Sequence, residues 1–280
     1  MRTWFITGAS RGFGALITQQ VLAAGDAVVA TARNPATITE RLGNHPNLLA
    51  LALDVTDEAQ AHEAAREAIK RFGRIDVLVN NAGYGLLGAV EESSGPEVEK
   101  LFATNVFGLL AVTRAVLPHM RSQRSGHILN ISSIGGYTGF HGWGAYGATK
   151  FAVEGLTESM AIELAPLGIK ATVVEPGFFR TDFLDDQSLV RTALELPDYA
   201  ETVGAMRSAM ADANHAQPGN PAKLATALLA LVNAPNPPLR LPLGSDTVAA
   251  IARKHASVDA EVAVWHAVAV STDVWEKDAA

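Results

Sequence analysis

A tyrosine and a lysine lie four positions apart in the segment Tyr146-Gly147-Ala148-Thr149-Lys150. On a helix this spacing brings both side chains to one face. A phenol ordinarily loses its proton near pH ~10, and an adjacent ammonium favours the phenolate and lowers that pKa. Such a tyrosine can exchange a proton with an alcohol or carbonyl oxygen near neutral pH. Ser133 ends a strand-like run upstream, and its hydroxyl could hold the same oxygen. The alternative is a partly buried aromatic residue beside a solvated amine.

The composition excludes several other kinds of site. The 280 residues include no cysteine, which rules out disulfides, thiolate catalysis and cysteine metal sites. Apolar residues make up 48% and charged residues 18%, as in ordinary soluble globular proteins. A net charge of −7 without a basic block argues against nucleic-acid binding. The eight histidines lack metal-site spacing, so we expect no metal. Without a recognisable signal peptide or spanning apolar run, we expect a cytoplasmic protein with no membrane span.

Strand-like and helix-like segments alternate along the chain. The expected strands cover residues 3–7, 27–31, 48–53, 75–79, 127–131, 170–174 and 239–244. The expected helices cover residues 14–24, 57–73, 96–119, 145–165, 221–232 and 246–255. Continuous apolar strands that alternate with helices imply a parallel sheet covered on both faces. We therefore predict an α/β fold, a Rossmann-type doubly wound parallel sheet of about seven strands, in one domain over 1–280 with a C-terminal extension at 221–280.

The loop Thr7-Gly8-Ala9-Ser10-Arg11-Gly12-Phe13-Gly14 follows the first strand and opens the first helix. In this context a glycine pattern indicates dinucleotide binding. Glycines let the backbone approach a pyrophosphate, and the helix N-terminus offers unpaired N–H groups and a positive dipole end. Such a loop can also serve only as a turn, so the glycines alone do not establish dinucleotide binding.

The glycine loop and the Tyr-x-x-x-Lys pair together resemble the classical short-chain dehydrogenase/reductase family. Further matches follow in family order: Asp54 after the third strand, Asn80-Asn81-Ala82-Gly83 after the fourth, Asn105 in the long helix, Ile131-Ser132-Ser133, Pro176-Gly177 after the sixth strand, and Thr181. The tail, with Phe178 and Phe179, is similar to bacterial members of the 17β-hydroxysteroid and retinol dehydrogenase subgroup. That similarity does not establish a steroid substrate. Each residue alone also has an ordinary structural explanation, such as a turn, a cap or a strand end.

The resemblance implies an oxidoreductase that interconverts a carbonyl group and an alcohol by hydride transfer. It implies a catalytic tetrad of Asn105, Ser133, Tyr146 and Lys150. It implies that the cofactor contacts Gly8, Ser10, Arg11, Gly12, Phe13, Gly14, Arg33, Asp54, Val55, Asn81, Ala82, Gly83, Tyr146, Lys150, Pro176, Gly177 and Thr181. It also implies a homodimer or homotetramer, formed through the helices that carry Asn105 and Tyr146.

The second strand bears on the choice of nicotinamide cofactor. An acidic residue at its end would bind the ribose 2′-OH and select NAD, but this stretch contains Arg33 and no acid. Arg33 and Arg11 can bind a 2′-phosphate through charge-assisted hydrogen bonds. We therefore expect NADP(H) to be preferred, with NAD(H) possible. The alternative is that both arginines are solvated surface residues.

The substrate region lies beyond the carboxyl ends of the strands. Gly135, His141 and Trp143 lie between the serine and the tyrosine, and Phe178 and Phe179 follow the sixth strand. These residues indicate an apolar or aromatic pocket for a small carbonyl or alcohol substrate. Residues 178–220 are expected to form a lid. Two alternatives stay open: a cofactor-binding sensor without turnover, and an epimerase or dehydratase on the same fold.

Overall fold

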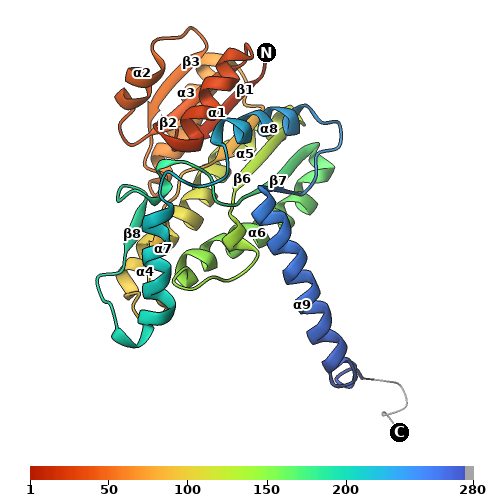
Figure 1. Ribbon diagram of the computed structural model, residues 1–280. Helices are drawn as coiled ribbons and strands as arrows, with labels where there is room; N and C mark the ends of the chain where they lie inside the picture. Colours follow the sequence, from red (N-terminus) through yellow and green to blue (C-terminus); the bar gives the residue numbers. More distant parts are fainter. Residues whose placement is uncertain (275–280) are drawn as a thin grey trace.

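Seven parallel strands form the centre of the computed structural model, which describes residues 1–274 (Figure 1). Their spatial order is β3-β2-β1-β4-β6-β7-β9. The bounds are β1 Thr3–Thr7, β2 Ala27–Ala32, β3 Leu48–Ala52, β4 Val77–Asn80, β6 Gly126–Ile131, β7 Ile169–Pro176 and β9 Arg240–Leu243. The chain winds outward from β1 in one direction and from β4 in the other. The crevice between these two strands is therefore the topological switch point at which such sheets bind ligands. The predicted fold class is confirmed.

Helices cover both faces of the sheet. One layer contains α3 (Glu58–Phe72), α5 (Leu109–Gln123) and α6 (Gly144–Leu164). The other contains α1 (Gly12–Ala23), α2 (Ala36–Leu42) and α8 (Pro221–Asn233). A capping residue fixes the start of α3, where the Asp57 side chain accepts a hydrogen bond from the Gln60 N–H.

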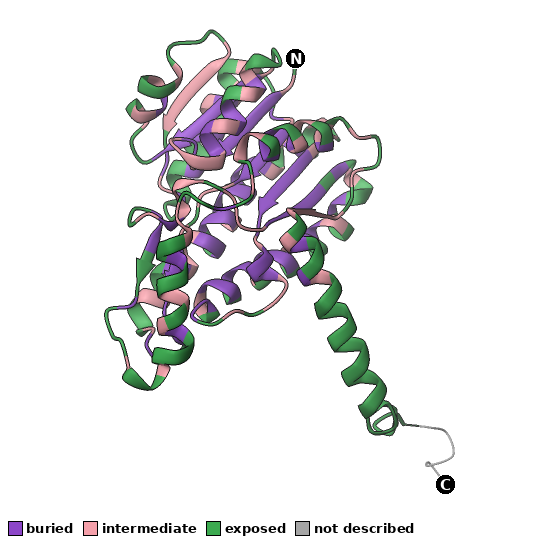
Figure 2. Cartoon of the chain, in the orientation of Figure 1, coloured by how far each residue is buried: buried purple, intermediate pink, exposed green. Residues whose placement is uncertain are grey.

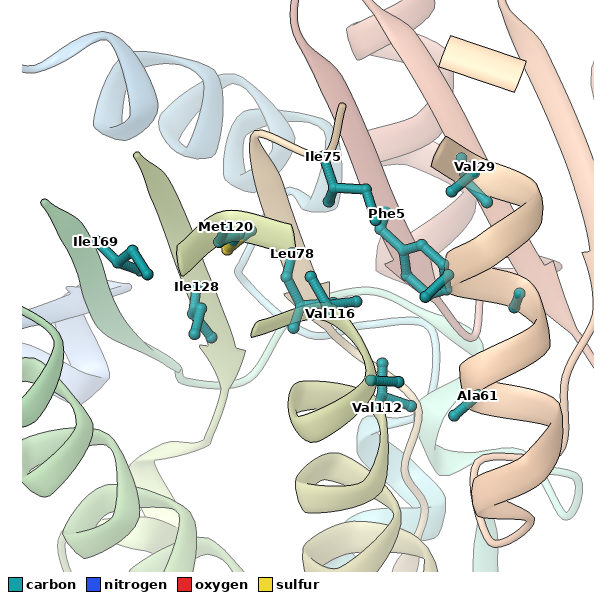
Figure 3. Packing of buried hydrophobic residues seen from close by; sticks show 14 of the residues in the cluster. Phe5, Val29, Ala61, Ile75, Leu78, Val112, Val116, Met120, Ile128 and Ile169 are labelled. Atoms are coloured by element: carbon teal, nitrogen blue, oxygen red, sulfur yellow. The ribbon is translucent and has the colours of Figure 1, made fainter. Parts of the chain in front are cut away.

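The larger core cluster lies between the sheet and the layer of α3 and α5. Phe5, Leu78 and Ile128 point from the strands towards Val112, Val116 and Ala61 of the helices (Figure 3). The alternation of apolar side chains on the two strand faces explains this packing, because successive residues of a strand point to opposite layers. Trp4, Ile6 and Val28 accordingly pack on the other face against α1 and α8.

The long helix expected at 96–119 is interrupted, which corrects that expectation. The structure has α4 at Gly95–Phe102, a π-helical segment at Ala103–Gly108 and then α5. The continuous stretch Gly95–Gln123 is long and apolar enough to cross a membrane by length and composition. It packs as a core helix, however, since Val112, Ala115, Val116 and Met120 are all buried in the main cluster.

Several short elements have no counterpart in the sequence analysis. They are α2, the paired strands β5 (Gly85–Leu87) and β8 (Leu189–Arg191), and α7 (Ala205–Ala213). Strands β5 and β8 form a separate parallel two-stranded sheet beside the carboxyl edge of the main sheet. Their pairing ties the segment after β7 to the segment after β4, which brings residues 183–190 over the end of the sheet.

The last helix, α9, spans Ser245–Val270 and projects from the body of the protein (Figure 1). The sequence predicts a helix ending near His255, and the structure corrects this because the helix continues through an alanine-rich run. Alanine favours helix even without tertiary contacts. Of the extension expected at 221–280, residues 275–280 lie outside the described residues. The division into one domain, a lid and an extension stays a prediction.

Candidate active site

The glycine loop positions an open helix N-terminus at the carboxyl end of β1. Gly8 and Gly12 adopt φ angles of +65° and +52°, which glycine reaches without strain. Helix α1 begins at Gly12, and no side chain caps its first turn. A Cβ on Gly14 would collide with the Gly8 carbonyl oxygen and lie 2.7 Å from Asn81 Nδ2. The loop is therefore closely packed against the end of β4. The N–H groups of the first turn of α1 remain available to an anionic ligand.

Asn81 and Thr7 join this loop to the neighbouring strand end. Asn81 Nδ2 donates to the carbonyl oxygens of Thr7 and Gly8 at 2.9 and 3.1 Å. The Thr7 hydroxyl oxygen accepts from the N–H groups of Asn81 and Ala82, each at 3.0 Å. These bonds join the ends of β1 and β4 across the switch point. The Asn81 side chain therefore holds the glycine loop in place.

Arg33 and Asp54 lie at one end of the same crevice, after β2 and β3. Asp54 Oδ1 accepts hydrogen bonds from the Thr56 hydroxyl at 2.7 Å and the Thr56 N–H at 3.0 Å. These bonds, with a smaller contribution from Arg33, lower the pKa of Asp54. Arg33 itself is exposed. A carboxylate with a lowered pKa and an exposed guanidinium thus lie together at this end of the crevice.

Tyr146 and Lys150 occupy one face of α6, and both are buried. Lys150 Nζ lies 5.7 Å from the centroid of the tyrosine ring and donates to the Ile131 carbonyl oxygen at 2.9 Å. The tyrosine ring packs against Trp143 and Phe183, with centroid separations of 5.4 and 5.7 Å. Ser133 follows β6, and its Oγ accepts the Gly135 N–H at 3.1 Å. The predicted serine, tyrosine and lysine are therefore brought to one place.

Burial shifts the pKa values of this pair in opposite directions. It raises the pKa of Tyr146, and the Ser133 hydroxyl works against that rise. It lowers the pKa of Lys150 to about 8, against which Glu154 favours the charged form. The Tyr-x-x-x-Lys spacing indicates only the lysine's effect on the phenol, whereas the desolvation of both groups follows from their burial in the fold.

Glu154 lies one turn beyond Lys150 on the same face of α6. The sequence patterns did not single it out. It is buried, and Arg240 of β9 pairs with it and with the buried Glu175, the latter at 2.8 Å. Burial raises the pKa of Glu154 to about 7; Glu175 adds to the rise, whereas Ser132 and Arg240 oppose it. The i, i+4 spacing from Lys150 was visible in the sequence, but the charged partners on distant strands were not.

Asn105 lies within the π-helical segment, close to the lysine. Its Nδ2 donates to the carbonyl oxygen of Tyr84 at 2.9 Å and to Thr149 Oγ1 at 3.1 Å, and its Oδ1 accepts the Tyr84 N–H at 3.1 Å. A Cβ on Gly83 would lie 3.0 Å from Asn105 Oδ1 and 3.8 Å from Lys150 Nζ. The asparagine therefore holds the loop after β4 beside Lys150.

A cavity of about 840 Å³ runs from Arg33 to Tyr146 and connects these parts. Its lining includes the predicted residues Gly8, Ser10, Arg11, Gly12, Phe13, Arg33, Asp54, Val55, Asn81, Ala82, Gly83, Ser133, Gly135, Trp143, Tyr146, Lys150, Pro176, Gly177, Phe178, Phe179 and Thr181. Gly14 and Asn105 lie behind the lining. His141 is exposed and is not among the lining residues. Further apolar side chains line it, among them Phe140 between the serine and the tyrosine, and Val190 and Met206, which were not predicted as site residues.

The segment after β7 contacts the rest of the site through two arginines. Arg207 of α7 pairs with the buried Glu92 at 2.6 Å, and Glu92 also accepts the Leu196 N–H at 2.8 Å. Arg11 of the glycine loop donates to the carbonyl oxygen of Gln187 at 2.6 Å. Phe183 lies in the same segment and packs on the ring of Tyr146. The aromatic end of the cavity is thus closed partly by this segment.

Comparisons with known proteins decide the family. A family model described as short chain dehydrogenase matches residues 2–190. The chain belongs to the short-chain dehydrogenase family. It is similar to a short-chain dehydrogenase of known structure from Streptomyces avermitilis, with 43% identity, a TM-score of 0.90, and coverage of 98% of this chain and 100% of that one.

Two other relatives of this short-chain dehydrogenase bear on its ligands. It is 40% identical over 240 residues to the 3-ketodihydrosphingosine reductase of Bacteroides thetaiotaomicron, covering 85% of this chain and 86% of that protein. The structure of ElxO with NADP bound has 30% identity and a TM-score of 0.73, covering 89% and 99% of the two chains. The chain is an NAD(P)-dependent oxidoreductase that acts on CH–OH groups, and the narrower hydroxysteroid or retinol subgroup stays a prediction.

Proposed function

We propose that this short-chain dehydrogenase reduces an apolar ketone or aldehyde to the alcohol, and catalyses the reverse oxidation, with NADP(H) as the preferred cofactor. The observation that carries the proposal is the meeting of Ser133, Tyr146 and Lys150 at the aromatic end of a cavity whose other end contains Arg33. A reduced nicotinamide, when bound, supplies the hydride.

The proposed roles follow from the positions of the side chains. Ser133 Oγ donates a hydrogen bond to the carbonyl oxygen, and Tyr146 gives its phenolic proton to that oxygen as the hydride reaches the carbonyl carbon. The ammonium of Lys150 stabilises the phenolate that remains. Asn105 holds the loop beside the lysine and, as the family resemblance implies, completes a proton path to solvent. Burial alone opposes ionisation of Tyr146, so the lysine and serine must supply the stabilisation of the phenolate.

The cofactor preference is supported by two positively charged residues on the cavity lining. Arg33 is exposed at the end of β2, and Arg11 lies in the glycine loop, both on the cavity lining. The NADP bound to ElxO, a relative with 30% identity, is consistent with this preference. The open α1 N-terminus and the closely packed glycine loop fit the pyrophosphate of either cofactor.

An apolar substrate is supported by the aromatic end of the cavity. Trp143, Phe178 and Phe183 line it beside the tyrosine, and the chain is 40% identical to a protein named 3-ketodihydrosphingosine reductase. We propose that residues 178–220 act as a lid over this substrate. The parallel pairing of β8 with β5 and the Arg207–Glu92 ion pair are its attachments to the body.

We also propose a homodimer or homotetramer in the cytoplasm, built through the helices that carry Asn105 and Tyr146. Two large aromatic side chains on these helices support this assembly, because Phe107 and Phe151 are 61% and 48% exposed. A contact between copies through these helices would remove this apolar surface from water.

The experiment that tests the function follows the near-ultraviolet absorbance of NADPH and NADH with the purified chain. The panel contains long-chain 3-keto amines, aryl ketones, aliphatic aldehydes, steroids and retinoids. Consumption of NADPH that depends on an apolar carbonyl compound, and production of NADPH from its alcohol, are expected. NADPH binding without turnover of any member in either direction would favour a cofactor-binding sensor. Product isomers without net cofactor consumption would favour an epimerase.

A further inference from the structure

Helix α9 joins the body of the protein through its first two turns. Thr247 and Ala250 are its buried residues, and from residue 252 to the end of the helix every residue is exposed (Figure 2). The first turn follows β9 closely, and β9 pairs with β7 so that Leu243 lies beside Pro176. The attached end of α9 therefore lies next to the segment that leaves β7 and lines the cavity.

Asp246 in the first turn of α9 reaches this segment. Its Oδ2 accepts a hydrogen bond from the Phe178 N–H at 2.7 Å, across 68 positions of the chain. The Phe178 carbonyl oxygen accepts the Gly219 N–H at 2.9 Å, and the Gly177 N–H donates to the Leu243 carbonyl oxygen at 2.9 Å. Of these three contacts, only the one with the carboxylate can be removed by replacing a side chain.

Two glycines leave the space that the Asp246 carboxylate occupies. A Cβ on Gly177 would collide with both carboxylate oxygens, and a Cβ on Gly244 would collide with Oδ1. Gly244 has a φ of +102°, which favours glycine in any case, whereas Gly177 is not among the residues with a positive φ. The close approach of the carboxylate, and not the backbone conformation, therefore explains the glycine at position 177.

The segment that Asp246 holds contacts both ends of the cavity. Phe178 packs in the apolar cluster that contains Tyr146 and Trp143, whereas Phe179 packs against Phe13 of α1 with a ring-centroid separation of 5.5 Å. All five residues line the cavity. The hydrogen bond to the Phe178 N–H thus fixes the wall that lies between the glycine loop and the reacting tyrosine.

We propose that Asp246 is a positioning residue for the cofactor, whose carboxylate holds the Phe178–Phe179 wall against the nicotinamide half of NADP(H). The inference rests on the proposed function, because the ligand is the cofactor proposed for this cavity. Asp246 does not line the cavity itself, so it acts through the backbone of Phe178. Arg33 follows β2, which three strands separate from β7. NADPH and NADH should therefore depend on Asp246 equally.

The dissociation constants of NADPH and NADH, measured by fluorescence with the full-length chain, test this role without a substrate. Asp246→Ala is expected to raise both constants by about tenfold, as for the loss of a hydrogen bond to a charged group. Asp246→Asn keeps an acceptor oxygen for the Phe178 N–H, so both constants should stay within about threefold of the wild type.

Thr247→Val is the matched control in the same turn of α9. It removes the hydrogen bond from the Thr247 hydroxyl to the Leu243 carbonyl oxygen at 3.1 Å and leaves the Phe178 N–H bonded. It should lower the urea midpoint without changing either dissociation constant. Amide hydrogen exchange of the peptide that contains Phe178 should be faster in Asp246→Ala and wild-type-like in Asp246→Asn and Thr247→Val.

Gly177→Ala provides a second, independent variant. Its methyl group should displace the carboxylate and weaken both cofactors as Asp246→Ala does. In the Asp246→Ala background the methyl group meets no carboxylate, so adding it should change the constants by less than about threefold, and the two effects should be strongly non-additive. Additive effects would show that the cofactor itself requires Gly177 and would overturn the proposal.

Two further results would also overturn it. One is equal weakening of binding in Asp246→Asn and Asp246→Ala, because the hydrogen bond would then not be the cause. The other is faster exchange at Phe178 with unchanged dissociation constants, because the held wall would then not position the cofactor. Failure of the wild-type chain to bind either nucleotide would contradict the proposed function as well, whereas changes confined to the variants concern Asp246 alone.

Discussion

Glu154 follows Lys150 by one helical turn on α6, and its carboxylate favours the charged form of the lysine within a buried site. Tyr146, Lys150 and Glu154 thus form one face of a single helix. Behind the carboxylate, Arg240 joins it to Glu175 and to the half-exposed Glu158. The protonation state of the lysine is consequently set by β7 and β9 as well as by its own helix.

Replacement of Glu154 by glutamine should therefore shift the alkaline limb of the pH–rate profile to lower pH. The wild-type lysine has a pKa of about 8, and loss of the carboxylate removes an influence that raises it. Glu154 itself has a pKa of about 7. Its effect on the pKa of Lys150 therefore grows above pH 7, where the carboxylate is ionised. We expect kcat/KM near pH 8 to fall by roughly threefold to tenfold, because one pK unit is a factor of ten.

Glu158→Gln is the matched control for this shift. Glu158 binds the same arginine, but its side chain is 49% exposed, so solvent screens its charge. An unchanged alkaline limb in Glu154→Gln, or the same shift in both variants, would show that the carboxylate does not act through Lys150.

His127 should make the folded state less stable in acid. Its Nε2 lies 2.9 Å from the Thr172 hydroxyl, which itself donates to the Pro238 carbonyl oxygen, so Nε2 is the donor of this bond. Burial, with Lys170, lowers its pKa from 6.5 to about 4. The unfolded chain therefore binds a proton more readily, and the stabilisation present above pH 6.5 is lost as the pH falls towards 4. The separation corresponds to roughly 3 kcal/mol.

Denaturant unfolding of His127→Gln and wild type at several pH values measures this contribution. The difference between their free energies of unfolding should change between pH 7 and pH 4 as the wild type is destabilised. His62→Gln, at an exposed position of α3, should retain the wild-type pH dependence. A His127→Gln curve parallel to that of the wild type would contradict the assignment of a neutral buried imidazole.

Arg33→Ala should weaken the use of NADPH without weakening that of NADH. Loss of a charge-assisted hydrogen bond of about 1.5–3 kcal/mol corresponds to a roughly tenfold to hundredfold lower kcat/KM with NADPH. Arg41→Ala is the control, since Arg41 is exposed in the last turn of α2 and does not line the cavity. Equal loss with both cofactors would indicate a structural effect, and an unchanged NADPH-to-NADH ratio would refute the proposed 2′-phosphate contact.

Gly14→Ala should destabilise the fold and the cofactor site together. Its methyl group would meet the Gly8 carbonyl oxygen and Asn81 Nδ2, both of which belong to the lock between β1 and β4. Overpacking of this kind typically costs about 1–3 kcal/mol. The exposed Gly155 of α6 has no atom within 4 Å of an added Cβ, so Gly155→Ala should instead raise stability by about 0.5–1 kcal/mol. Urea unfolding midpoints measure both, and equal effects would contradict the close packing at Gly14.

The sequence predicts the sheet well because its strands are continuous apolar runs between clear turn and cap signals. Asp57 and Asn220, residue types that favour the N-cap position, cap α3 and α8. Local patterns cannot reveal the π-helical segment at Ala103–Gly108, because its hydrogen bonding depends on packing with the loop after β4. The pairing of β5 with β8 is likewise invisible, since each is three residues long and far from its partner in sequence.

The candidate site likewise contains residues that local patterns indicate and residues that only the fold brings together. Glycine, serine, tyrosine and lysine spacings are local, and the cavity contains most of the residues that they indicate. Arg240, by contrast, reaches Glu154 across 86 positions, which no local pattern can show. His141 was placed near the reacting oxygen by sequence proximity, but Gly142 has a φ of +75° and the chain turns there, so that Trp143 and not His141 lines the cavity.

Tyr146→Phe, measured for both turnover and NADPH binding, is the decisive test of Tyr146 as the proton donor. With a substrate identified from the panel, kcat/KM should fall by about 10²–10⁴, the usual contribution of a proton donor. The NADPH dissociation constant should stay within about threefold, because the ring that packs on Trp143 and Phe183 is retained. Turnover within about threefold of the wild type would show that Tyr146 is not the proton donor and would contradict the mechanism proposed for this site.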